Sequence, residues 1–275
     1  MDYSQYSLAK TGYLKEDFRL FHINDRTDQE FEWHYHDFHK IIIFVSGKVT
    51  YHIEGKAYQL KPQDILLVSQ GAIHKPEIDP SIPYERYIFW IRDDLSSPEL
   101  NTCFQKANDR SFNLIRLDSV LQEKLKDLLP EIEHSLRDTQ FGDSILSKAL
   151  FAQFMVYINR IFLKSSTAPD QKSYSSDSQV EQLLKYINRN LSENLSIDHL
   201  AERFFFSKYH MMRKFKKETG YTIHNYIISK RLLHARSLIA QGTPVMKAAM
   251  QSGFQDYTAF VRAYKKQFGT VPTQR

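Results

Sequence analysis

Short apolar runs alternate with turn residues from Phe18 to Trp90, which is the pattern of β-strands. Gly47 and the pair Glu54-Gly55 lie between such runs and tolerate the positive φ that hairpin turns require. Since no helical pattern lies between the runs, they predict an antiparallel β-barrel or sandwich rather than a parallel sheet. The runs expected to be strands are FRLFHI (18–23), FEWHY (31–35), KIIIFV (40–45), KVTYHI (48–53), AYQL (57–60), DILLV (64–68) and YERYIFW (84–90).

From Asp118 onward the apolar residues take helical spacing. They form two stripes separated by a break near Phe141-Gly142, so two helices are expected over about residues 118–163. Either both stripes pack on the barrel, or one of them forms a dimer seam. The stripes are Val120, Leu121, Leu125, Leu128 and Leu129, then Ile145, Leu146, Leu150, Phe154, Tyr157, Ile158 and Ile161.

A Ser-rich stretch at 164–178, KSSTAPDQKSYSSDS, predicts a linker. Beyond it the spacing is helical throughout, with a longer helix expected from about Ile223 to Ala240. Cap residues mark the other helices. The expected starts are Ser196, Ser207, Thr243-Pro244 and Asp256, and the expected ends are Gly220, Gly253 and Gly269.

Two C-terminal segments resemble each other at an offset of 49 residues: KYHMMRKFKKETG (208–220) and YTAFVRAYKKQFG (257–269). Each follows a short expected helix and a tight break, so the repeated unit is a helix-turn-helix. In this motif the second helix, about 10–12 Å wide, enters a DNA major groove of about 12 Å.

Position along each repeated helix suggests a role for its residues. Base-contact candidates near the helix starts are Tyr209, Met212, Arg213, Tyr257, Thr258 and Arg262. Phosphate-contact candidates are Ser207, Lys208, Lys216, Lys217, Lys265 and Lys266, although the lysines near the helix ends can instead be solvated charges favoured by the helix dipole. Met211, Phe215, Phe260 and Tyr264 are expected in the core.

Charge separates the two halves of this 275-residue chain. Its net charge is +5, but residues 179–275 hold 16 Lys and Arg against 6 Asp and Glu, whereas residues 1–178 have a net charge of −5. The basic half suits a polyanion such as DNA, and the alternative is an unevenly charged solvated surface. With one cysteine, Cys103, no internal disulfide can form, and neither a secretory signal nor an apolar run of about 20 residues is visible. A cytoplasmic protein is therefore expected.

The segment GFQDYTAFVRAYKKQFGTVP (253–272) resembles the signature of AraC/XylS-type transcription regulators, and the resemblance extends to SKYHMMRKFKKETGYT (207–222). It implies a sequence-specific regulator, expected to be an activator and a homodimer that contacts RNA polymerase. It also implies seven helices in residues 179–275, with both recognition helices in successive major-groove segments about 34 Å apart. The chain departs from the pattern at Phe205, where a turn glycine is common, at Tyr264, where Phe is usual, and in its tail.

Residues 34–78 resemble the cupin-type sensor domain that many of these regulators carry. The matching marks are His34-x-His36, Gly47, the EGK turn, Pro62, Asp64, Gly71 and His74. Metal-binding cupins use two His, a Glu and a distant His, but Lys40 stands in place of the Glu, and an ammonium repels a cation. We therefore expect no metal or other cofactor. The alternative is a metal site at His34, His36 and His74, completed by His39 or Asp37.

A small organic effector is expected instead, and the resemblance points to sugars, which are common effectors of such regulators. Its candidate contacts are Arg19, His34, His36, Lys40, His74, Tyr87 and Trp90. Other interpretations are a barrel that only dimerises, a metal-dependent cupin enzyme fused to a DNA-binding domain, and an architectural DNA binder. No nucleophile elbow, phosphate loop or H-E-x-x-H motif is present, so an enzyme is not expected.

The expected fold is therefore an α+β multidomain protein. Residues 1–163 form a cupin-like, jelly-roll effector-binding and dimerisation domain, with its barrel at about 15–92 and helices at about 118–163. Residues 164–178 form a linker, and residues 179–275 form an all-α DNA-binding domain with two helix-turn-helix units joined by a long helix.

Overall fold

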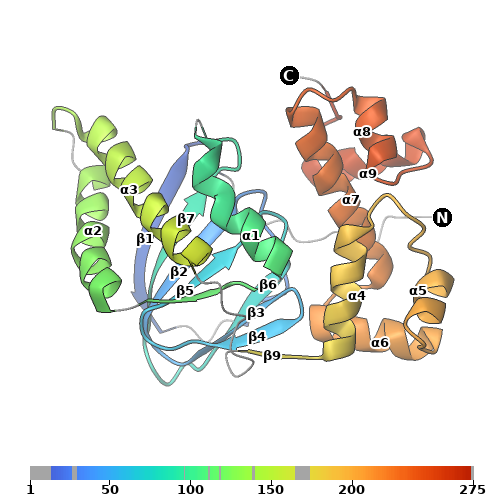
Figure 1. The fold of residues 1–275 in the computed structure, drawn as a ribbon, viewed down its shortest axis with the longest axis horizontal. Coiled ribbons are helices and arrows are strands. Elements are labelled where there is room, and N and C mark those ends of the chain that lie inside the picture. Colours follow the sequence, from blue (N-terminus) through green and yellow to red (C-terminus); the bar gives the residue numbers. More distant parts are fainter. Residues whose placement is uncertain are drawn as a thin grey trace.

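The computed structural model describes residues 14–26, 30–95, 97–110, 112–117, 119–137, 140–164 and 174–273. Strands with three accompanying helices make up the N-terminal part, and six helices of the described residues 174–273 make up the C-terminal part (Figure 1). Most of the expected linker, residues 165–173, and the first 13 residues lie outside the described residues.

Two antiparallel sheets form the N-terminal part. One sheet has the strand order β1-β7-β2-β5-β8 and the other the order β6-β3-β4-β9. Their facing sides share one apolar cluster, to which Ile42 and Leu66 contribute from the first sheet and Tyr51 and Tyr58 from the second. The strands are β1 (Phe18–Asp25), β2 (His39–Ser46), β3 (Val49–Ile53), β4 (Lys56–Gln59), β5 (Asp64–Val68), β6 (His74–Ile78), β7 (Tyr84–Ile91), β8 (Leu114–Arg116) and β9 (Ser175–Ser176).

The antiparallel jelly-roll arrangement agrees with the expectation, but individual strands differ. The described strands form two facing sheets, which is the sandwich form of the expected barrel or sandwich. FEWHY is not a continuous strand: it contains only isolated bridge residues, among them His34, which bridges to His74, while Trp33 packs on the C-terminal part. Strands β6, β8 and β9 were not expected from the sequence, and β9 lies inside the expected linker. Strand β6 contains Pro76 but is an edge strand, where proline is tolerated.

Three helices cover the outer face of the five-stranded sheet: α1 (Thr102–Arg110), α2 (Ser119–Arg137) and α3 (Asp143–Lys164). A short 3-10 helix, η1 (Pro98–Asn101), precedes α1, and neither was expected from the sequence. Most of the expected stripe residues of α2 and α3 pack on the sheet, as Leu128 and Phe154 do, whereas Val120, Ile145 and Leu146 at the helix starts are exposed. Among the described helices, only α3 is long and apolar enough to cross a membrane, but its buried side belongs to this core.

Cap residues position the C-terminal helices as expected. The side chains of Ser196, Ser207 and Asp256 accept backbone N–H groups at the starts of α5, α6 and α9. Pro244 rather than Thr243 is the N-cap of α8. The helices are α4 (Ser178–Arg189), α5 (Ile197–Arg203), α6 (Lys208–Thr219), α7 (Ile223–Ala240), α8 (Val245–Gln251) and α9 (Tyr257–Phe268), so the described part of this region holds six helices instead of seven.

Candidate nucleic-acid interface and sensor site

Helices α6 and α9 are built alike. Each ends at a glycine in the left-handed region, Gly220 at φ 75° and Gly269 at φ 74°. The Gly220 N–H donates to Lys216 O at 2.9 Å, and the Gly269 N–H donates to Lys265 O at 2.8 Å. The repeat in the sequence is therefore a repeat in the structure, with α7 between the two units (Figure 1).

The base-contact candidates face solvent. Tyr209 is 71% exposed, Met212 41% and Tyr257 42%. Arg213, Thr258 and Arg262 are also exposed, and no ion pair is described for either arginine among the described residues. In contrast, the residues expected in the core, Met211, Phe215, Phe260 and Tyr264, are buried, which confirms that assignment.

A hollow of about 270 Å³ lies beside the first recognition helix. Four base- or phosphate-contact candidates of α6 line it, together with residues of α5 and of the start of α7. Its lining residues are Ile197, Tyr209, Met212, Arg213, Lys216, Thr222, Ile223 and His224. The hollow therefore lies along the exposed side of α6.

The phosphate-contact candidates Ser207, Lys208, Lys216, Lys217, Lys265 and Lys266 are all exposed. Lys208 forms an ion pair with Asp198 at 2.5 Å, so part of its charge is already balanced. Lys217 lies 4.0 Å from Glu218, a weak surface pair.

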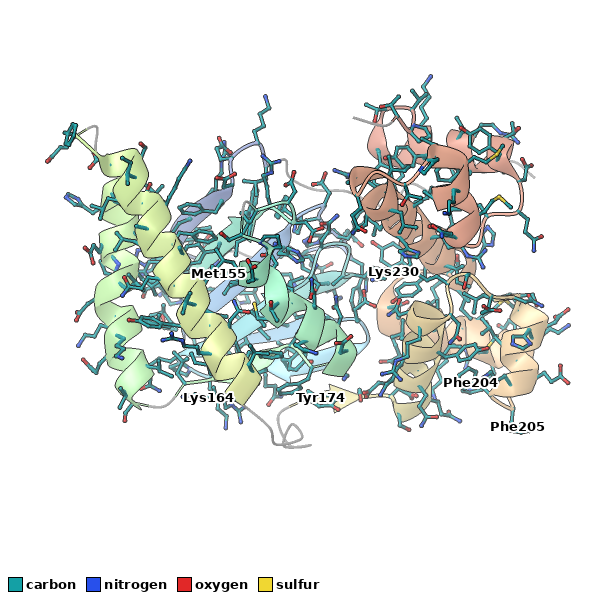
Figure 2. All side chains as sticks on the ribbon, turned by 45° about the horizontal axis from the view of Figure 1, so that its top comes forward. Met155, Lys164, Tyr174, Phe204, Phe205 and Lys230 are labelled. Carbon is teal, nitrogen blue, oxygen red and sulfur yellow. The ribbon has the colours of Figure 1, made fainter. Side chains whose placement is uncertain are left out.

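The turns of the two units differ in the residue that takes the left-handed conformation. Phe205 has φ 54° in the first turn, and Gly253 has φ 88° in the second. A left-handed backbone costs a non-glycine residue free energy, and the Phe205 ring is 96% exposed, so burial does not offset that cost. Figure 2 shows Phe205 at the outer edge of this unit.

In the N-terminal part, strand register sorts the effector candidates by face. Arg19, Trp90 and Lys40 occupy the same row across β1, β7 and β2, and thus point to the same side. Lys40 Nζ donates to His36 Nε2 at 3.3 Å. The rings of His36 and Trp90 lie 6.1 Å apart, so these groups gather at one end of the sheets.

Three of the candidates form a cluster of imidazoles. The ligand atoms of His34, His36 and His74 all lie within 4.8 Å of one another. Burial lowers the pKa of His34, and burial together with the Lys40 charge holds the pKa of His74 well below its usual value. Burial also lowers the pKa of Lys40 to about 8. Burial thus disfavours the charged forms of His34, His74 and Lys40, which lie close together.

Two effector candidates do not join this cluster. Tyr87 points to the opposite face of the sheet, where it packs with the helix-side core and stacks on His22. Arg19 is exposed and pairs with Glu16 at 2.7 Å.

His39 and Asp37, the residues considered as replacements for the missing metal-binding glutamate, have other partners. His39 Nε2 lies 2.9 Å from Asp93, while its Nδ1 accepts from the Gln70 N–H at 3.0 Å. Asp37 pairs with Arg236 of α7 at 3.2 Å. Neither side chain completes a ligand set with the imidazole cluster.

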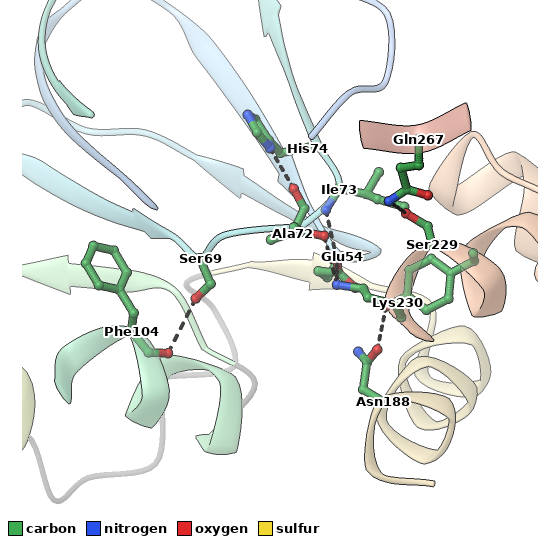
Figure 3. Close-up of polar contacts among 12 residues, drawn as sticks. Glu54, Ser69, Ala72, Ile73, His74, Phe104, Asn188, Ser229, Lys230 and Gln267 are labelled. Atoms are coloured by element: carbon green, nitrogen blue, oxygen red, sulfur yellow. Dashed lines mark hydrogen bonds and ion pairs between the residues drawn. The ribbon is translucent and has the colours of Figure 1, made fainter. Parts of the chain in front are cut away.

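The contacts that link the two parts of the chain could not be predicted from the sequence. Glu54, in the β3–β4 turn, pairs with Lys230 of α7 at 2.8 Å, and Lys230 also donates to Gly71 O at 3.0 Å (Figure 3). The Ile73 N–H donates to Glu54 at 2.8 Å, and Tyr226 of α7 donates its hydroxyl to the same carboxylate. Figure 2 shows Lys230 between the two parts.

Similarity to known proteins agrees with this division. Residues 20–155 match the family described as AraC-like ligand binding domain, and residues 200–275 match a helix-turn-helix domain family. The activator RhaR of Mannheimia succiniciproducens is 23% identical over 89% of this chain and 86% of its own length. The activator RhaS of Yersinia pestis is 25% identical over 88% of each chain.

A solved structure of ToxT from Vibrio cholerae covers 94% of this chain and 96% of its own, with 14% identity and a TM-score of 0.40. The two family matches together span most of the chain and follow the order of the two parts described above. The chain belongs to the AraC/XylS family of DNA-binding transcription regulators and carries an N-terminal AraC-like ligand-binding domain.

Proposed function

We propose that this regulator reads two successive major-groove segments of DNA through α6 and α9, and that a small molecule in the N-terminal domain modulates its action. The observation that carries the DNA part is the structural repeat: two capped helices, each with an exposed arginine at the same position, Arg213 and Arg262. Arginine donates two hydrogen bonds to guanine O6 and N7, which is the commonest specific base contact.

In this proposal the side chains divide by role. Tyr209, Met212, Arg213, Tyr257, Thr258 and Arg262 contact bases, and the exposed Ser207, Lys208, Lys216, Lys217, Lys265 and Lys266 contact phosphates. Helix α7 fixes the spacing, since it connects the two units directly. Two recognition helices on one DNA face read half-sites about one helical turn apart.

The effector site of this proposal is the gathered set His34, His36, Lys40, His74 and Trp90. Two supports are its burial and its mixture of donors, acceptors and an aromatic face. A third support is its proximity to α7, because the segment from Gly71 to His74 ends in the cluster and also accepts a hydrogen bond from Lys230. A ligand that moves this segment changes the contact with the helix that spaces the two recognition helices.

The proposal also includes the cellular setting. We divide the chain into an effector-binding and dimerisation domain at 1–163, a linker at 164–178 and a DNA-binding domain at 179–275. The regulator acts in the cytoplasm as a homodimer, contacts RNA polymerase as an activator and catalyses no reaction. The supports are the relatives named as transcriptional activators and the buried Cys103, whose pKa burial raises to about 12, so it offers no nucleophilic thiolate.

Selection of duplexes from a random DNA library by the full-length protein tests the DNA part. Two enriched half-sites with centres about 10 base pairs apart are expected. Arg213→Ala should relax the preference in one half-site and Arg262→Ala in the other, each at a cost of about 1–3 kcal/mol. Arg137→Ala on α2, which removes an exposed arginine paired with Glu133, is the matched control. Absence of any enriched motif, or a motif unchanged in both recognition-helix variants, refutes the proposal.

A further inference from the structure

We infer that residues 33–37, WHYHD, form a strap that positions the two recognition helices relative to each other. Trp33 and Asp37, at the two ends of the strap, contact the C-terminal part, while His34 and His36 belong to the imidazole cluster. The consequence for DNA binding rests on the proposed function, whereas the contacts of the strap do not.

Trp33 lies at the C-terminal end of the first recognition helix. Its side chain packs against the core of this helix-turn-helix unit, and a Cβ added at Gly220 would lie 2.1 Å from Trp33 Cδ1. The Tyr221 hydroxyl donates to the Trp33 carbonyl at 2.7 Å. Since Gly220 is the residue at which α6 ends, Trp33 holds the end of that helix.

Asp37 reaches the C-terminal end of the second recognition helix through one arginine. The half-buried Asp37 carboxylate pairs with Arg236 of α7 at 3.2 Å. The Arg236 guanidinium also lies over the Phe268 ring, 4.9 Å from its centroid. Because Phe268 is the last residue of α9, Asp37 acts on the end of that helix.

The two ends of the strap therefore meet equivalent points of the repeat. Gly220 corresponds to Gly269 at the offset of 49 residues, and Phe268 directly precedes Gly269. An extended chain advances about 3.3–3.6 Å per residue, so the strap spans at most about 13–14 Å from its first Cα to its last. A link this short limits how far the two helix ends can separate while both contacts are kept.

The middle of the strap is also held against the C-terminal part. Tyr35 is fully buried. Burial raises the pKa of Tyr35, and the nearby charge of Arg236 opposes this rise. The same arginine thus lies close to both Tyr35 and Asp37, so the strap follows α7 instead of touching it at one point only.

The two helix-turn-helix units need such a connection because they have separate apolar cores. Phe215 and Tyr226 belong to the core of the first unit, and Leu232 and Phe260 belong to that of the second. Helix α7 runs through both cores, so a bend or twist of this one helix changes the orientation of α6 relative to α9. The strap adds a second connection beside α7.

The other side of the strap faces the imidazole cluster. His34 bridges to His74, and His36 Nε2 accepts from Lys40 at 3.3 Å. The Gly71 N–H also donates to His36 O at 2.9 Å. A change in the cluster therefore acts on the same short backbone whose other side chains hold the ends of the recognition helices.

Binding of the full-length protein to two duplexes tests the positioning role. One duplex carries both selected half-sites, and in the other the second half-site is scrambled. Asp37→Asn should weaken binding to the first duplex by about 3- to 30-fold and leave binding to the second unchanged, because each unit keeps its own core. Asp79→Asn, which removes a carboxylate paired with Lys48 elsewhere in the N-terminal part, is the matched control and should change neither.

The difference between the duplexes separates positioning from folding. Equal weakening on both duplexes in Asp37→Asn, or weakening on neither, overturns the positioning role. A wild type that binds neither duplex counts against the proposed function instead, and the strap is then decided by a measurement without DNA.

The fluorescence of Trp33 supplies that measurement. Trp90→Phe leaves Trp33 as the one tryptophan of the chain. In this background Asp37→Asn should shift the Trp33 emission maximum to longer wavelength, because a loosened strap exposes the indole to water. Lys40→Met, which removes the hydrogen bond to His36, should also shift the maximum. His22→Gln, which alters a ring stacked on Tyr87 at the opposite face of the sheet, should not.

The two variants test separate parts of the inference. An emission maximum that Asp37→Asn leaves unchanged overturns the strap. A maximum that shifts in Asp37→Asn but not in Lys40→Met overturns only the connection to the imidazole cluster, as does an equal shift in Lys40→Met and His22→Gln.

Discussion

Replacement of Phe205 by glycine should stabilise the protein, against the usual effect of losing a large aromatic side chain. Phe205 holds φ 54°, a conformation that costs a non-glycine residue about 1–2 kcal/mol. Its ring is 96% exposed, so truncation sacrifices almost no buried area. Glycine also raises the entropy of the unfolded state, which costs about 0.5–1 kcal/mol of folding free energy. The net gain in the free energy of unfolding is therefore about 0.5–1 kcal/mol.

Thermal unfolding of the full-length protein, followed by circular dichroism, measures this gain. A rise in Tm of about 2–5 °C is expected for the transition of the C-terminal part. Phe206→Gly is the matched control: Phe206 has negative φ and packs on the core of the same unit, so its loss should lower Tm. A lower Tm for Phe205→Gly, or equal shifts in the two variants, would refute the explanation by backbone strain.

Three further outcomes are expected. If the five candidate lysines contact phosphates, DNA affinity should fall with a log–log salt slope of about −4.5, or about 500-fold between about 50 and 200 mM salt, and a slope near zero in a filter-binding series contradicts this. Gly220→Ala should lower Tm by more than Gly269→Ala, because both have positive φ but a Cβ at Gly220 would lie 2.1 Å from Trp33 Cδ1, while nothing lies within 4 Å at Gly269. A hydrogen bond from His39 holds the pKa of Asp93 below its usual value, so Asp93 stabilises the fold above about pH 4 and loses this effect as the pH falls through its folded pKa. Asp93→Asn should therefore lower Tm at pH 7 and leave it nearly unchanged at pH 2, and an equal loss at both pH values would contradict this assignment.

The helices of the C-terminal part could be predicted from the sequence because their signals are local. Caps such as Ser207 and Asp256 act on backbone groups two or three residues away, and helical periodicity is read within a few turns. The exposed arginines and the buried aromatics of α6 and α9 followed from that periodicity alone. The same repeat indicated the helix-turn-helix units.

The sheets were harder to predict because β7 is covered on both faces. Helices α2 and α3 lie on one side and the second sheet on the other, so both faces are apolar and alternation does not say which way Tyr87 points. FEWHY has the residues of a strand, but Trp33 uses its apolar surface against the C-terminal part, and its carbonyl accepts from Tyr221 at 2.7 Å. Tertiary contacts thus overrode local preference.

By itself, then, the sequence determined most of the strands, the helices from α2 onward, the basic helix-turn-helix repeat and the presence of three histidines near one lysine. Only the tertiary structure decided that His74 meets His34 across a bridge, that Lys40 occupies the lone pair of His36, and that Glu54 reaches Lys230, 176 residues away. Such pairings depend on strand register and domain packing, which are set by the whole core and leave no periodic trace along the chain.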